Sequence, residues 1–184
     1  MIDAPLGLTN ILTVVLAVCC LWTTTAQTRA SIIRLWRLSV PAVFAAVVAL
    51  VLLAGVFDAT LPHDGEWVAG LVLGSLIGRS RGHALAVEID RVWGLVRLPS
   101  AADGVLAATG IVILSMVDFA SAALQDPVTE PIHVAAAAAF CAGFIGCRAV
   151  AIMGRSSQSR HVELHTVGER SKSKDLETRF VIDR

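Results

Sequence analysis

The chain has few charged residues for its length. Lysine, arginine, aspartate and glutamate make up 16% of its 184 residues, whereas soluble domains contain about a quarter. The 15 basic and 15 acidic side chains cancel, which argues against a nucleic-acid-binding protein and against an acidic disordered segment. The four cysteines form no C-x-x-C pair, so neither a zinc ribbon nor a disulfide-stabilised scaffold is expected.

Motifs that carry chemistry are also missing. The sequence contains no nucleophile elbow, P-loop, dinucleotide fingerprint or metalloprotease helix. We therefore predict that the protein is not an enzyme and holds no cofactor. Apolar residues, in contrast, make up 55% of the chain, and the mean hydropathy is +0.72. This composition predicts a multi-pass membrane protein whose first partner is the lipid bilayer.

Five stretches are candidates to cross a membrane. A transmembrane helix needs roughly 20 mainly apolar residues to cross a hydrocarbon core of about 30 Å. The third stretch is the least clear, because its apolar run from Trp67 ends at Gly78, directly before Arg79. Beginning that helix at Pro62, a favoured first position, makes it long enough. The predicted spans are 6–25, 38–57, 62–79, 105–124 and 132–153.

The positions of the charges predict the orientation. With five crossings, every lysine and arginine falls on one side of the membrane, and the other side has acidic residues but no lysine or arginine. The positive-inside rule then places the N-terminus outside and the C-terminus inside. We expect an all-α membrane protein with five transmembrane helices in residues 1–154. Residues 155–184 are expected to form a flexible polar cytoplasmic tail.

The segment between the third and fourth spans predicts a short cytoplasmic β-hairpin. Apolar and polar residues alternate roughly from Ala84 to Asp90 and again from Leu95 to Arg97. Gly94 stands at the turn, where an unusual φ is needed, and Pro99 ends the segment. An amphipathic turn at the membrane interface is the alternative.

Three glycines of the third span point to close helix packing. Gly70, Gly74 and Gly78 are four residues apart and therefore share one helix face. The lack of side chains allows another helix to approach closely. Packing within the monomer and a homodimer contact are both compatible with this pattern.

Asp118 is the carboxylate that lies well inside a predicted span, about six residues from its outer end. An ionisable group at that depth is costly and is a functional candidate by default. A proton- or ion-coupled carrier is one interpretation. The other is a structural carboxyl group that is hydrogen-bonded or faces a cavity. Ser115 and Ser121 lie within one helical turn, in reach of a hydrogen bond to it.

Two histidines are weak candidates for a metal or haem-edge site. His63 and His133 stand at the outer starts of the third and fifth spans, with Asp64 and Glu66 nearby in the sequence. Imidazole and carboxylate suit borderline cations, but two histidines without a fixed spacing do not define a site. No metal site is predicted.

One region resembles a known family. The run from Gly70 to Gly78, followed by Asp90-Arg91, Gly94-Leu95-Val96, Pro99 and a further span, resembles small bacterial membrane proteins of the CcdC-like family. These are largely domains of unknown function, and the resemblance covers about 60 of the 184 residues. It implies a multi-pass protein of the bacterial cytoplasmic membrane. The family name is associated with cytochrome c maturation, and no functional residue carries over.

These observations favour a non-enzymatic accessory, assembly or scaffold protein that packs against itself or a membrane-protein partner. A carrier that uses Asp118 is the first alternative, and a redox or haem-handling factor is the second.

Overall fold

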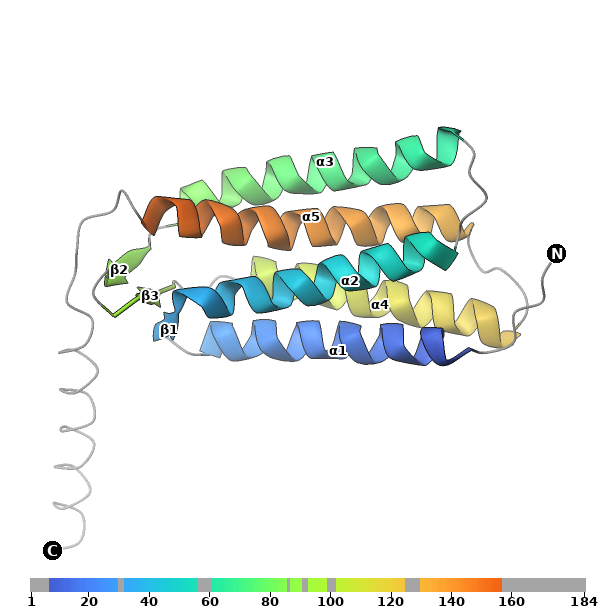
Figure 1. Ribbon diagram of the computed structural model, residues 1–184, viewed down its shortest axis with the longest axis horizontal. Coiled ribbons are helices and arrows are strands. Elements are labelled where there is room, and N and C mark those ends of the chain that lie inside the picture. Colours follow the sequence, from blue (N-terminus) through green and yellow to red (C-terminus); the bar gives the residue numbers. More distant parts are fainter. Residues whose placement is uncertain are drawn as a thin grey trace, which may run out of the picture.

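The computed structural model is an up-and-down arrangement of helices with a small sheet at one end (Figure 1). The residues it describes are 7–29, 32–55, 61–85, 87–90, 93–98, 102–124 and 130–156. Consecutive helices run in opposite directions, so α1, α3 and α5 are parallel to one another (Figure 1). The helices are α1 (Leu8–Arg29), the 3-10 turn η1 (Leu35–Leu38), α2 (Ser39–Gly55), α3 (Leu61–Ala84), α4 (Asp103–Leu124) and α5 (Pro131–Ser156).

Four of the helical segments are long and apolar enough to cross a membrane: Leu8–Thr28, Leu35–Gly55, Asp103–Leu124 and Pro131–Arg155. The α3 helix does not meet the same test over its described residues, because polar side chains occupy both of its ends. Proline stands in the first turn of α2, α3 and α5. Proline is tolerated there because the amide hydrogen it lacks would have no partner within the helix.

Several helices extend beyond the predicted spans. The α1 helix continues to Arg29 and α3 to Ala84, although the bilayer core requires neither extension. In α1, hydroxyl groups near this end bond to the backbone of their own helix, as Thr24 does to the Cys20 carbonyl at 2.7 Å. The α5 helix ends at Ser156, so it includes the first two residues of the predicted tail. The rest of that tail lies outside the described residues.

The core of the bundle is built from small apolar side chains. The α1, α2, α4 and α5 helices pack around it, and α3 packs along the outside of α5. Small side chains let helix backbones approach closely, which is how membrane helices gain packing energy. The fully buried alanines are Ala17, Ala45, Ala108, Ala135, Ala138 and Ala139.

A three-stranded antiparallel sheet covers one end of the bundle, which we call the sheet end (Figure 1). The strands are β1 (Ile32–Arg34), β2 (Glu88–Asp90) and β3 (Leu95–Arg97), in the order β1-β3-β2. The predicted hairpin is confirmed as β2 and β3, and Gly94 has φ +59° in its turn. The third strand, β1, was not predicted. Ile33 and Val96 of the sheet are buried against Ile152 of α5.

The contact between α3 and α5 brings two backbones together. A Cβ atom placed on Gly70, Gly74 or Gly78 would collide with a backbone carbonyl oxygen of α5. A Cβ atom on Gly82 would lie 2.7 Å from the Ala151 side chain. From the other side, a Cβ atom on Gly143 would lie 2.6 Å from the Leu71 carbonyl oxygen. The glycine face therefore lies against α5 of the same chain, and the interpretation of it as a homodimer contact is wrong.

Replacing Gly74 by alanine is expected to destabilise the protein, because the added methyl group meets the Phe140 carbonyl oxygen. Overpacking of this kind typically costs about 1–3 kcal/mol. Gly146→Ala is the matched control on α5, since a Cβ atom there meets nothing within 4 Å. Thermal unfolding in detergent measures both variants. Equal midpoints for the two would contradict the tight α3–α5 contact.

Candidate functional site

Asp118 bonds to a neighbouring helix and not to the serines of its own. Its Oδ2 atom accepts a hydrogen bond from Nδ2 of Asn10 in α1, at 3.3 Å. The hydroxyl group of Ser115 instead donates to the Ile111 carbonyl, at 2.9 Å. Ser115, one of the two serines within reach of Asp118 in the sequence, therefore bonds to its own helix. The carboxyl group is partly buried and joins α1 to α4 near the end opposite the sheet.

A cluster of three charged side chains lies nearer the sheet end. Asp103, at the start of α4, accepts from Arg148 Nη2 at 3.2 Å and from Arg81 Nε at 3.2 Å. The side chains of Arg148 and Asp103 are only 15% and 17% exposed, whereas that of Arg81 is 57% exposed. We call these three residues the Asp103 cluster. It joins α3, α4 and α5 through one carboxylate.

Arg148 is the least solvated member of the cluster. It lies eight residues before the end of α5, or about 12 Å along the helix axis. Its Nε atom is buried without a hydrogen-bond partner among the described residues. Gly104 leaves room for the guanidinium group, because a Cβ atom there would lie 2.7 Å from Arg148 Nη1. An arginine in such a place needs a counter-charge, which Asp103 supplies.

Arg155 caps the C-terminal end of α3. Its Nη1 atom donates to the carbonyl oxygens of His83 at 2.9 Å and Leu85 at 2.7 Å, and to that of Gly82 at 3.4 Å. The last carbonyls of a helix have no partner within it and carry a partial negative charge. The α5 helix therefore supplies the cap of α3.

His133, one of the two weak metal candidates, lies beside two glutamates. His133 Nδ1 lies 3.1 Å from Glu66 Oε2, and its Nε2 lies 3.7 Å from Glu130 Oε2. No group of His, Cys, Asp and Glu side chains suited to a metal ion occurs in the described part of the chain. The side chain of His63 lies outside the described residues.

Sequence analysis missed Asn10, Asp103 and the partners of Arg148. An acidic residue in the first turn of a helix is a common dipole-compensating feature, so Asp103 alone gave no functional signal. The signal that existed was Arg148 itself, because an arginine inside an apolar span needs a counter-charge. The sequence does not indicate which carboxylate supplies it.

Replacing Arg148 by methionine is expected to lower the free energy of unfolding by about 3 kcal/mol, the lower end for a broken buried ion pair. The lower end applies because Arg81 still neutralises Asp103. Arg81→Met is the control, and an exposed pair typically contributes at most about 1 kcal/mol. Unfolding by denaturant in detergent gives both values. A loss as large for Arg81→Met as for Arg148→Met would refute the assignment of Arg148 as the buried partner.

Comparisons of the chain with protein-family models, with curated proteins and with solved structures gave no match. The arguments for its function therefore rest on its own residues and their arrangement.

Proposed function

We propose that the protein is a five-span protein of the bacterial cytoplasmic membrane that acts as a non-enzymatic assembly or scaffold component. Its N-terminus is outside and its C-terminus is inside. The bacterial membrane is the part of this proposal that rests on the resemblance to CcdC-like proteins. The number of spans, the orientation and the role each rest on separate observations.

The case for a fifth span comes from the way α3 lies alongside α5. The two helices are parallel, and four glycines of α3 each lie beside the backbone of a residue 66 positions later, from Gly70 with Ala136 to Gly82 with Arg148. With 24 residues, α3 is about 36 Å long, which exceeds the hydrocarbon core. Since α5 is apolar enough to span, a helix held in constant register beside it spans with it.

The outward face of α3 supports the same conclusion. Its large apolar side chains are about half exposed, which suits contact with lipid better than contact with water. The exposed residues are Val68, Val72, Leu73, Leu76 and Ile77.

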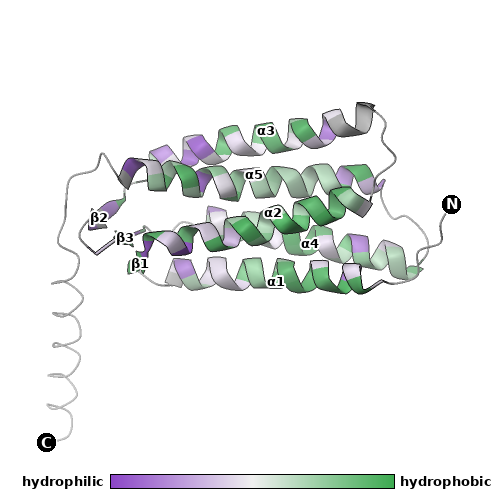
Figure 2. Cartoon of the chain, in the orientation of Figure 1, coloured by the Kyte–Doolittle hydropathy of each residue, from purple (hydrophilic) through white to green (hydrophobic). Residues whose placement is uncertain are grey.

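The case for the orientation comes from the arginines at the sheet end. Figure 2 shows hydrophilic residues gathered where α3 and α5 approach the sheet, with hydrophobic helix centres beside them. The acidic residues Glu66, Glu130 and Asp118 lie toward the opposite end. Basic residues mark the cytoplasmic side. The described arginine side chains at the sheet end are Arg34, Arg37, Arg79, Arg81, Arg97, Arg148 and Arg155.

The observation that carries the scaffold role is the rigid contact between α3 and α5. Alternating access requires one part of a bundle to move against another. Sliding α3 along α5 would bring residues with side chains to positions where only glycine fits. The buried hydroxyl groups of Thr13, Thr24 and Ser115 also bond to carbonyls of their own helices. A rigid bundle of this kind suits the positioning of a partner better than transport.

A pair of variants, each with one added cysteine, tests whether α3 crosses the membrane. We expect an impermeant maleimide, added outside intact cells, to label Glu66→Cys and to leave Ser80→Cys unlabelled until the membrane is permeabilised. Both positions are exposed and lie on the same helix. The unmodified chain sets the background, because its four cysteines lie within helices. Equal labelling of the two variants from outside would contradict a crossing by α3.

Native mass spectrometry of the protein, extracted gently from its own membrane, tests the scaffold role. We expect a partner protein, or a second copy of the chain, at fixed stoichiometry. A bare monomer would contradict the proposal.

The Asp118→Asn variant separates the scaffold from the carrier in the same experiment. An asparagine retains an oxygen that accepts from Asn10, so the variant is expected to keep both its fold and its partner. Proton flux into liposomes containing the purified protein gives the second readout. Flux in the wild type that the variant loses would identify a carrier.

A further inference from the structure

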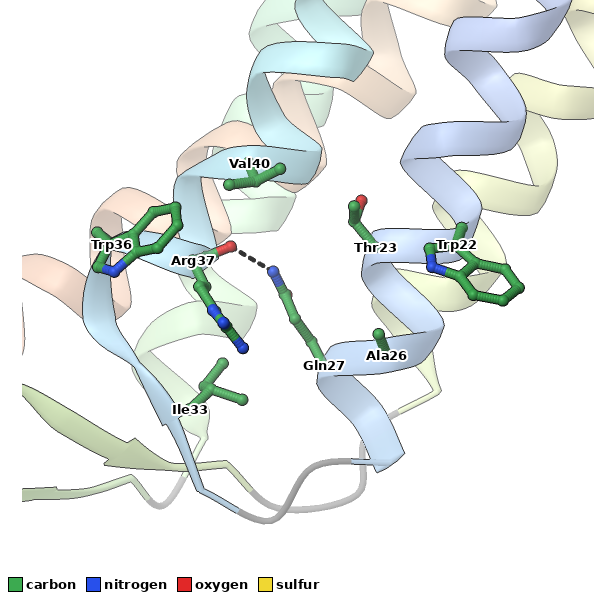
Figure 3. Close-up of a pocket in the computed structure, with 8 residues that line it drawn as sticks. All are labelled: Trp22, Thr23, Ala26, Gln27, Ile33, Trp36, Arg37 and Val40. Atoms are coloured by element: carbon green, nitrogen blue, oxygen red, sulfur yellow. Dashed lines mark hydrogen bonds between the residues drawn. The ribbon is translucent and has the colours of Figure 1, made fainter.

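A pocket opens at the sheet end between α1 and the start of α2. It has a volume of about 270 Å³ and is lined by Trp22, Gln27, Ile33, Trp36, Arg37 and Val40, among others. Figure 3 shows the Arg37 side chain reaching into the gap between α1 and η1, toward Ile33 and Gln27. Gln27 Nε2 donates to the Arg37 carbonyl and fixes the distance between the two walls.

Arg37 brings to this pocket a positive charge that no carboxylate of the described residues neutralises. The described carboxylates of the sheet end are engaged elsewhere: Asp103 with Arg81 and Arg148, and Glu88 with Arg97 at 3.1 Å. The third carboxylate, Asp90, is buried and accepts from the Trp93 amide in the hairpin turn. Arg37 Cζ instead lies 5.8 Å from the centroid of the Trp36 ring, which holds the guanidinium group without neutralising it.

The surroundings of Arg37 match the boundary between lipid tails and headgroups. Trp22 and Trp36 are 73% and 58% exposed, and tryptophan is enriched at this level of a membrane. Figure 3 places them on either side of the pocket. A second pocket shares Trp36 with the first and is also lined by Arg34 and Trp93. At this level of a membrane, the apolar wall of the first pocket would face lipid tails and its cationic group would lie near the phosphates.

We propose that this pocket binds one anionic phospholipid. The guanidinium group of Arg37 donates to the phosphate oxygens, since its planar fork suits a phosphodiester. An acyl chain lies along Trp22, Ala26 and Val40, between α1 and α2. Arg34, close by and exposed, favours a headgroup without a compensating amine. The lipid comes from the cytoplasmic leaflet, and only this part of the proposal rests on the proposed orientation.

Lipid titration followed by native mass spectrometry tests this site. The purified full chain in detergent is titrated with phosphatidylglycerol or with phosphatidylcholine, and the fraction carrying one lipid is measured. We expect a preference for phosphatidylglycerol, and a reduction of that preference of about five- to tenfold in Arg37→Ala, as expected for one arginine near a phosphate. Arg37→Lys keeps the charge without the fork and is expected to lie in between.

Arg79→Ala is the matched control, because Arg79 is an exposed arginine on α3 outside the pocket. It is expected to bind lipid as the wild type does. Equal losses in Arg37→Ala and Arg79→Ala, or no preference for phosphatidylglycerol in the wild type, would overturn the proposal. Glycerol 1-phosphate added in excess is expected not to displace the lipid, and displacement would assign the pocket to a soluble phosphate. None of these outcomes depends on a protein partner, so the scaffold role is tested separately.

Discussion

The backbone contact between α3 and α5 is the constraint on which the rest of the structure depends. Judged by hydropathy, α3 is the weakest of the long helices, and it packs chiefly against one neighbour. Gly70, Gly74 and Gly78 remove the side chains that would hold the helices apart, so dispersion forces act between backbones along most of the contact. Because β2 and β3 follow α3 directly, its position also sets the position of the sheet against α5.

The elements that the sequence predicted well are those decided by local physics. Helix positions follow from apolar runs matched to the bilayer thickness, and the hairpin from alternation around Gly94. The third strand was missed because Ile32–Arg34 is three residues long and stands between two helices. It is a strand only because β3 offers a free edge to it, through pairs such as Ile33 with Val96. Such pairing between distant segments leaves no periodic trace in the sequence.

The polar sites show the same division between local and distant signals. Asp118 stands out in the sequence because a carboxylate inside an apolar span is rare. Its partner Asn10 is 108 positions away and is one of many polar residues near a helix start. The pairing of Arg148 with Asp103 is equally invisible, although the structure needs it, since a buried guanidinium group without a carboxylate would be strongly destabilising. Residue type therefore indicates that a partner must exist, and only the fold identifies it.

The unpredicted strand also explains the pocket. Two antiparallel helices joined by a tight turn would close together at that turn, but β1 leads the chain sideways into the sheet before η1 begins. The Leu35 amide donates to the Gly94 carbonyl at 2.9 Å and holds this detour in place. The separation of α1 from η1 leaves the space into which Arg37 reaches. The hairpin therefore positions one wall of the proposed lipid site, because β1 pairs with β3 and leads directly into η1.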